Sequence, residues 1–249
     1  MEIKEQLYNT PSARVYLVTD DGKEAIYKEF KYQSGVVENN KYAAFVEQKT
    51  SRIVFPRKLE KEGVNVVGHY TDYIEGETLD KTGVGDRIDF DELIEGFRIL
   101  GTEYDEIATK GILVKDVNLA NLIYSNGKLF NIDVDSFSVV DIKIRNEDGT
   151  LNTKAVPVDV IKMKNRLALK QVCSTLVFNN ITLPAGIRKV FDKDLHSLMT
   201  PADVMLYDLK HAMELEYGKT FNTLSIMRNR INGVDDIGDN SNSRTYRGR

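Results

Sequence analysis

The sequence predicts an α+β protein of two lobes, in which a small antiparallel sheet with one helix precedes a largely helical part. Segments rich in β-branched and aromatic residues, separated by turn residues, fill the first 75 or so positions. Helical periodicity dominates after residue 90 and is interrupted by one tight hairpin. Strands first and helices later favour two lobes with a cleft between them. We place the lobes at residues 1–75 and 76–231, followed by a disordered tail at 232–249 with few apolar residues.

Two segments near the N-terminus predict a β-hairpin. Residues 13–19 and 24–30 are rich in the β-branched and aromatic side chains that strands favour. Asp21 and Gly22 lie between them, and Gly22 can take the positive φ of a tight turn. The two segments are therefore expected to pair as antiparallel neighbours.

A helix and a second pair of strands complete the predicted first lobe. Apolar residues in the segment 37–51 recur at helical spacing, which predicts a helix that Pro56 terminates at the latest. Strands are predicted at 57–61 and 64–74, joined by a turn at residues 62–63. These elements give a twisted antiparallel sheet with one helix.

The second lobe is predicted to begin with a long helix over residues 90–107, where apolar residues hold one face. Asp89 and Glu92 resemble a capping box, in which Asp89 accepts from the first turn and Glu92 reaches back. Gly111 provides a natural C-terminal stop.

A hairpin and three more helices follow. Asn126 and Gly127, the strongest short signal for a type I′ turn, separate predicted strands at 122–124 and 128–134. Further helices are predicted at 158–177, 184–191 and 201–215, the last with Thr200 as N-cap and Pro201 at the first helical position.

The composition excludes several classes of protein. The chain of 249 residues has a formal net charge of −4. Non-specific electrostatic binding to nucleic acid or to an anionic membrane is therefore not expected. No apolar run reaches the roughly 18 residues that span a bilayer. The first ten residues have neither the basic nor the apolar part of a signal peptide. We expect a cytoplasmic protein whose partners include neither nucleic acid nor membrane.

Cysteine and histidine give no sign of a metal centre. Cys173 is the single cysteine, which excludes an intramolecular disulfide and a cysteine-rich zinc site. Because it lies in the apolar run LKQVCSTLVF, we expect a buried structural thiol rather than a nucleophile. His69, His196 and His211 are scattered, and we expect them at core or solvated positions.

The residues that carry chemistry concentrate after the predicted long helix. Asp116 and Asn121 lie five positions apart in a loop that precedes the tight hairpin. On its second predicted strand, Asn131, Asp133 and Asp135 alternate with aliphatic residues, which would place the three polar side chains on one face. Buried neighbouring carboxylates are costly unless a cation neutralises them. Carboxylate and amide oxygens are hard ligands suited to Mg²⁺ held against phosphates.

This segment resembles the catalytic loop and metal-binding strand of the protein-kinase-like superfamily, especially small-molecule kinases of the aminoglycoside and choline kinase type. That family has an aspartate, an asparagine five residues later, a short hairpin and a metal-binding aspartate. Asp116, Asn121 and Asp133 match this pattern. The resemblance implies that Asp116 accepts or orients the proton of an acceptor hydroxyl, and that Asn121 and Asp133, with Asp135 contributing, hold Mg²⁺ on ATP.

The N-terminal half carries a similar resemblance. Residues 25–28, Ala-Ile-Tyr-Lys, resemble the Val-Ala-Ile-Lys strand of the family, which implies that Lys28 binds the α- and β-phosphates of ATP. Glu47 stands nineteen residues later, inside the predicted helix, at the distance of the lysine's ion-pair partner. Glu38 is the weaker candidate for that partner.

Residues 72–76, Asp-Tyr-Ile-Glu-Gly, resemble the hinge that follows the fifth strand of such kinases. The resemblance implies that backbone groups of Asp72 and Ile74 meet the adenine of ATP. It also implies the overall architecture, which is a two-lobed protein-kinase-like fold with a sheet N-lobe and a helical C-lobe.

The sequence departs from the family in its phosphate-binding loop. Tyr8, Thr10 and Ala13 stand where glycines usually allow backbone amides to approach phosphate. The side chains of Asn9, Thr10 and Ser12 can donate hydrogen bonds to the nucleotide instead.

Other departures concern the acceptor. Val114 and Lys115 replace the His-Arg pair of protein kinases, and no convincing Ala-Pro-Glu follows the metal strand. The expected function is ATP-dependent transfer of a phosphoryl group to a hydroxyl of a small molecule or protein, with ATP and Mg²⁺ as cofactors. Two alternatives stay open, a pseudokinase that binds nucleotide or protein without catalysis, and an AMP transferase of the same fold.

Overall fold

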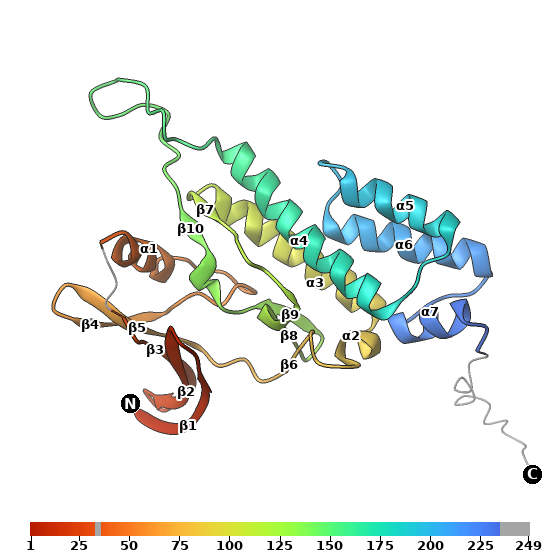
Figure 1. Ribbon diagram of the computed structural model, residues 1–249, viewed down its shortest axis with the longest axis horizontal. Coiled ribbons are helices and arrows are strands. Elements are labelled where there is room, and N and C mark those ends of the chain that lie inside the picture. The colour runs from red at the N-terminus through yellow and green to blue at the C-terminus, as the bar shows by residue number, and fades with distance from the viewer. Residues whose placement is uncertain (33–35, 235–249) are drawn as a thin grey trace, which may run out of the picture.

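The computed structural model describes residues 1–32 and 36–234, and these form the α+β arrangement that the sequence predicts (Figure 1). A five-stranded sheet with one helix lies at one end of the molecule, and the other helices gather beyond it. The predicted disordered tail lies outside the described residues from position 235 onward. No helix among the described residues has both the length and the apolar character needed to cross a membrane.

The five-stranded sheet is antiparallel throughout and has the strand order β1-β2-β3-β5-β4. Its elements are β1 (Glu2–Asn9), β2 (Ala13–Asp20), β3 (Lys23–Phe30), β4 (Lys58–Glu62) and β5 (Asn65–Asp72), with α1 (Val36–Val46) packed against β4 and β5. The first predicted hairpin is confirmed, because Asp21 and Gly22 have φ values of 52° and 77° at its turn. Strand β1 was not predicted from the sequence.

The predicted helix over residues 37–51 is too long at its C-terminal end. Helix α1 stops at Val46. The backbone amides of Ser51, Arg52 and Ile53 donate instead to the buried carboxylate of Glu103, which belongs to a different part of the chain. A backbone amide bound to a side chain cannot also continue a helical ladder.

The segment of residues 73–234 is mostly helical (Figure 1). In order, its elements are β6 (Glu77–Thr78), α2 (Val84–Arg87), α3 (Phe90–Ala108), β7 (Ile112–Leu113), η1 (Leu119–Asn121), β8 (Leu122–Ser125), β9 (Lys128–Asn131), η2 (Val134–Ser136), β10 (Ser138–Val139), α4 (Val158–Asn180), α5 (Ala185–His196), α6 (Ala202–Tyr217) and α7 (Leu224–Ile231). Helix α3 packs between α4 and α6 and also covers β9. The short strands form two small sheets, β6-β8-β9 and β10-β7.

The predicted helix ends are confirmed in part. The side chain of Asp89 accepts from the amides of Asp91 and Glu92 at 2.9 and 3.2 Å, as an N-cap does. The predicted return contact is wrong, because the Glu92 carboxylate accepts from the hydroxyl of Tyr124 on β8. Helix α6 begins after Pro201 without a side-chain cap, so the predicted role of Thr200 is also wrong.

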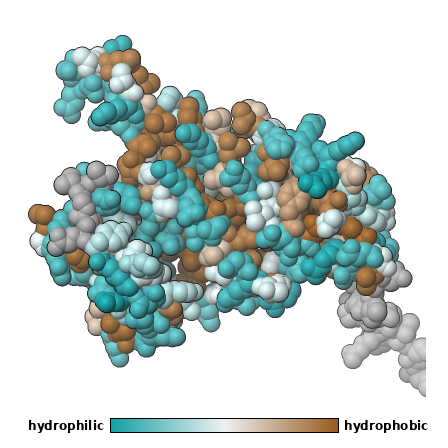
Figure 2. Space-filling model, viewed as in Figure 1, coloured by the Kyte–Doolittle hydropathy of each residue, from teal (hydrophilic) through white to brown (hydrophobic). Residues whose placement is uncertain are grey.

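One large core joins the helices to the five-stranded sheet. A smaller cluster within the sheet consists of Val18, Ala25, Tyr27 and Tyr70. Cys173 on α4 is fully buried in the large core, which confirms the predicted structural thiol, and burial raises the pKa of its sulfur well above the ordinary value. Between β10 and α4, residues 141–157 form a loop that projects from the body, and apolar atoms are visible on it (Figures 1 and 2). Ile144 and Leu151 on this loop are more than half exposed, at 61% and 63%.

Candidate functional site

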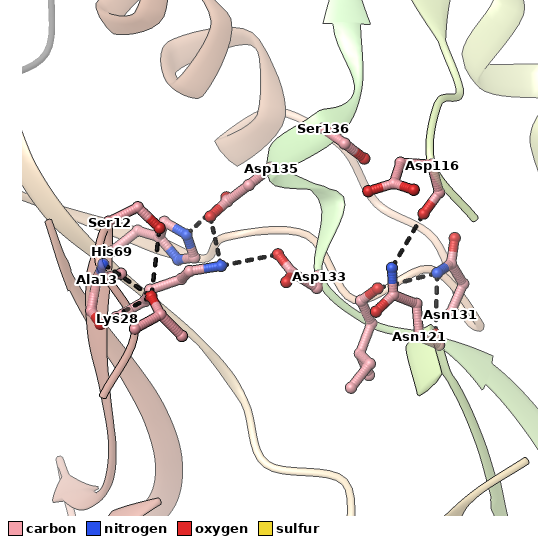
Figure 3. Close-up of polar contacts among 12 residues, drawn as sticks. Ser12, Ala13, Lys28, His69, Asp116, Asn121, Asn131, Asp133, Asp135 and Ser136 are labelled. Atoms are coloured by element: carbon pink, nitrogen blue, oxygen red, sulfur yellow. Dashed lines mark hydrogen bonds and ion pairs between the residues drawn. The ribbon is translucent and has the colours of Figure 1, made fainter. Parts of the chain in front are cut away.

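A polar cavity of about 210 Å³ lies where the sheet meets the loops around η1 and η2. Most of the residues to which the sequence assigns chemistry line it. The lining consists of Ser12, Ala13, Lys28, Phe30, Tyr32, Asp116, Asn121, Asp133, Asp135 and Ser136. The close-up in Figure 3 shows Lys28 of the sheet on one side and Asp133, Asp135 and Asp116 from the loops of the helical region on the other.

Lys28 is the cation at the centre of the site. Its Nζ lies 2.9 Å from Asp133 Oδ1 and 2.7 Å from Asp135 Oδ2, although the chain separates Lys28 from Asp133 by 105 residues (Figure 3). Burial of the amine acts to lower its pKa, but the charges of Asp135 and Asp133 outweigh burial, and the pKa of Lys28 is raised. Lys28 therefore stays protonated and can bind an anion such as phosphate.

The backbone places Asp133 and Asn131 differently from the prediction. The strand expected over 128–134 ends at Asn131, because Asp133 has a left-handed backbone with φ 56° and ψ 72°. Asn131 is fully buried, accepts from the Tyr104 hydroxyl at 2.8 Å and donates to the Asn121 carbonyl at 3.1 Å. The expected alternation is thus wrong, and Asn131 supports the site from behind while Asp133 faces the cavity.

Asp135 is enclosed more deeply than Asp133. Its Oδ1 lies 3.0 Å from Nε2 of His69, a residue of β5 that is only 5% exposed. Its backbone carbonyl accepts from Lys41 of α1 at 2.8 Å. Burial acts to raise the pKa of Asp135, but the bond from His69 and the charge of Lys28 outweigh it and hold the pKa well below the ordinary value.

His69 and Lys41 are site residues that the sequence interpretation missed. His69 was expected only at a core or solvated position, yet it pairs directly with Lys28 across β3 and β5. A strand residue opposite Lys28 shares its face of the sheet, so this register would have identified His69 had it been known. No comparable signal marks Lys41.

Asp116 and Asn121 form the opposite wall of the cavity (Figure 3). Nδ2 of Asn121 donates to the Asp116 carbonyl at 3.1 Å, which turns its amide oxygen away from that bond. The backbone of Asp116 is left-handed, with φ 52°. The other described non-glycine residues with a positive φ are Asp21 and Asn126, which lie in tight turns, and Asp133, which lies in the site. Strained backbone conformations cluster at active sites and ligand-binding sites, so those of Asp116 and Asp133 favour a functional role.

The residues present fit a magnesium ion. The side chain of Asp133 is 47% exposed and lines the cavity, and among the described residues only its Oδ1 is bonded, to Lys28. No hydrogen bond among the described residues occupies the amide oxygen of Asn121. Mg²⁺ usually takes one or two protein oxygens and completes its shell with water and phosphate. The pair Asp133 and Asn121 supplies that number of donors.

The structure does not bring Glu47 to Lys28. Glu47 lies in the turn after α1 and is exposed, whereas the described ion pairs of Lys28 are those with Asp133 and Asp135. The prediction of Glu47 as the partner of Lys28 is corrected for this reason. The alternative, Glu38, lies on α1 and is also not among these partners.

Of the other residues predicted to bind nucleotide, some line this cavity and others do not. Ser12 lines the cavity, but Thr10 closes its own turn through bonds between its hydroxyl and the backbone N–H and carbonyl of Ala13, both at 3.1 Å. Asp72 and Ile74 do not line this cavity and instead line a second one of about 360 Å³, together with residues of the segment 46–57.

Asn165 on α4 positions the loop of Asp116 and was missed from the sequence. Its fully buried amide accepts from the Val114 N–H at 2.8 Å and donates to the carbonyls of Tyr104 and Ile112, both at 3.1 Å. These three bonds fix the chain two residues before Asp116 to helices α3 and α4. An asparagine inside a helix gives no sequence signal for such a role.

Replacing Asn165 by alanine is expected to lower the free energy of unfolding by about 2–3 kcal/mol, because it leaves buried backbone groups without partners. Denaturant unfolding measures this loss. Asn179→Ala, at an exposed position of the same helix, is the control and should change stability little. Equal stability of the two variants would contradict the role of Asn165.

No protein-family model matches the chain, and a search of curated proteins finds no match either. The resemblance to kinase-like enzymes therefore rests on the residues themselves and on where they lie. Lys28, Asp116, Asn121 and Asp133 share one cavity, and Glu47 lies outside it.

Proposed function

We propose that this protein is an ATP-dependent phosphotransferase with a two-lobed kinase-like fold, which transfers a phosphoryl group to a hydroxyl of a small-molecule or protein acceptor. One observation carries the proposal. One cavity is lined by Lys28, whose pKa the neighbouring carboxylates raise, by Asp133 and Asn121, each with a side-chain oxygen to which no described residue hydrogen-bonds, and by the exposed Asp116. Phosphoryl transfer depends on such positioned charges more than on covalent chemistry.

Each residue has a role in this proposal. Lys28 binds the α- and β-phosphates, and Asn121 and Asp133 hold Mg²⁺, which neutralises phosphate charge when bound. Asp116 accepts, or at least orients, the proton of the acceptor hydroxyl as the oxygen attacks the γ-phosphorus, while the bond from that phosphorus to the bridging β-phosphate oxygen breaks and ADP leaves. Asp116 suits this role because it is exposed, lines the cavity and has no ion pair among the described residues.

Mg·ATP is expected to stabilise the wild-type protein and not the Asp133→Ala variant. A ligand that binds only the folded state adds about 2.7 kcal/mol at a hundredfold excess over Kd. Thermal unfolding with and without Mg·ATP measures the effect. Asp80→Ala, which removes an exposed carboxylate that does not line the cavity, is the matched control and should retain the wild-type shift.

Two results would count against this assignment. If Asp133→Ala keeps the full Mg-dependent shift, the metal site is misassigned. If wild type shows no shift at all, the protein does not bind Mg·ATP, and the proposed activity fails.

A second candidate, a pseudokinase that binds nucleotide or protein without catalysis, is favoured by the turn between β1 and β2. This turn has no glycine, and the Thr10 hydroxyl is engaged with Ala13. A pseudokinase would show the Mg·ATP shift but would not transfer labelled γ-phosphate. An AMP transferase would add the nucleoside monophosphate to its acceptor, which the mass of the product distinguishes.

A further inference from the structure

The two carboxylates that contact Lys28 have different surroundings. The side chain of Asp133 is 47% exposed and that of Asp135 is 20% exposed. Asp133 uses one oxygen, on Lys28, whereas both oxygens of Asp135 are engaged, Oδ2 by Lys28 at 2.7 Å and Oδ1 by His69 at 3.0 Å. A metal ligand needs an oxygen open to the cavity, and Asp133 is the better placed of the two.

Residues of three elements surround Asp135. His69 from β5 and Lys28 from β3 bind its side chain (Figure 3). From α1, Lys41 binds its backbone carbonyl, and burial together with the nearby charge of Asp135 raises the pKa of the Tyr42 hydroxyl. The rings of Phe30 and Tyr42 pack against His69, with centroid distances of 5.6 and 5.5 Å. The Asp135 carboxylate therefore has a fixed direction, and it points at the Lys28 ammonium.

Helix α1 contributes a cation, Lys41, to the surroundings of Asp135 and Lys28, and not the anion that was expected there. Lys41 lies close enough to Asp135 and Lys28 for their charges to act on its pKa, which burial lowers overall. Glu47, expected to be the anion, is exposed beyond the end of the helix. No acidic residue of α1 is among the described ion-pair partners of Lys28.

We infer that Asp135 is the positioning residue for Lys28, in the role that the resemblance assigns to Glu47, and that it is not a ligand of Mg²⁺. The inference rests on the proposed function, since it concerns how Lys28 meets the phosphates of ATP. Lys28 is then oriented by Asp135, which His69 of β5 holds, and α1 acts on it through the Lys41 bond to the Asp135 carbonyl and not through an acidic residue paired with Lys28. Asp133 remains with Asn121 to hold the ion.

Binding of ATP in EDTA and in a Mg²⁺ titration tests the inference on the full chain. Without metal, Asp135→Asn is expected to raise the Kd for ATP about tenfold, the equivalent of one charge-assisted hydrogen bond. Lys28→Met should raise it at least as much. In the Lys28→Met background no ammonium remains to be positioned. Adding Asp135→Asn to it should therefore change neither the metal-free Kd for ATP nor the Mg²⁺ midpoint, which is the Mg²⁺ concentration that gives half of the metal-dependent change in ATP binding.

Matched variants complete the experiment. Glu47→Gln should leave metal-free binding unchanged, and Asp133→Asn should raise the Mg²⁺ midpoint. His69→Phe keeps the ring that packs against Phe30 and removes one anchor of Asp135, so it should raise the metal-free Kd by less than Asp135→Asn. This milder variant provides the test if Asp135→Asn does not fold.

The outcomes separate the inference from the proposed function. Wild type that binds no ATP refutes the proposed function and the inference with it. If wild type binds ATP, the inference is overturned by a rise in the Mg²⁺ midpoint on adding Asp135→Asn to Lys28→Met, because Asp135 would then be a ligand. It is also overturned if Glu47→Gln weakens metal-free binding as much as Asp135→Asn, or if neither Asp135→Asn nor His69→Phe weakens it.

Discussion

Replacing Asp116 by asparagine is expected to lower the rate of phosphoryl transfer by about 10²–10⁴-fold, the usual contribution of a general base. Asparagine tolerates a left-handed backbone as well as aspartate does, so the φ of 52° at this position is preserved. The bond from Asn121 reaches the backbone carbonyl of Asp116 and survives the change. The variant should therefore fold normally and bind Mg·ATP with nearly unchanged affinity.

The measurement combines transfer or release of labelled γ-phosphate with the Kd for Mg·ATP. Asp141→Asn changes an exposed carboxylate that does not line the cavity, and this control should keep the wild-type rate. Equal losses of rate and of nucleotide affinity in Asp116→Asn would show that Asp116 binds ATP and does not serve the acceptor. An unchanged rate would remove Asp116 from the mechanism.

Glu103→Ala is expected to produce the largest loss of stability, about 3–5 kcal/mol, because several buried donors lose a charged acceptor at once and each unsatisfied group costs about 1–3 kcal/mol. The Glu103 carboxylate on α3 is almost fully buried and accepts from the amides of Ser51, Arg52 and Ile53 and from the Ser51 hydroxyl, at 2.6–3.2 Å. Alanine would leave these donors without a partner. The free energy of unfolding of a typical domain is only about 5–15 kcal/mol, so this loss would be a large part of it.

Denaturant unfolding measures this effect, and two further variants define its cause. Glu106→Ala, at an exposed position of the same helix, should be nearly neutral. Glu103→Gln should fall between wild type and Glu103→Ala, because it keeps one acceptor oxygen. If Glu103→Ala is as stable as Glu106→Ala, the network does not join α3 to the segment after α1.

Much of the fold could be predicted because its signals are local. The turns at Asp21-Gly22 and Asn126-Gly127 were predicted from residue type and have the positive φ values that were expected. The cap at Asp89 and the length of α3 follow from the chemistry of neighbouring residues. The end of α1 could not be predicted, because Glu103 lies about fifty positions away in the chain.

In the candidate site, too, the features that depend on nearby residues could be predicted and those that depend on distant contacts could not. Asp116, Asn121 and Asp133 lie within one segment, and their spacing was enough to group them. The exact path of that segment was not predictable, since Asn131 turns into the core to meet Tyr104 and Asp133 adopts a left-handed backbone. The sequence therefore indicated which residues gather and not which way each one faces.

The α+β class, the turns, the helix faces and the grouping of Asp116, Asn121 and Asp133 could be predicted, because they depend on residues close together in the chain. The partners of Lys28 could not be predicted and emerged from the folded structure. It placed Asp135 and His69 beside the lysine and left Glu47 in solvent. The physical reason is that an ion pair between distant residues depends on burial and on the register of strands, which spacing along the chain does not encode.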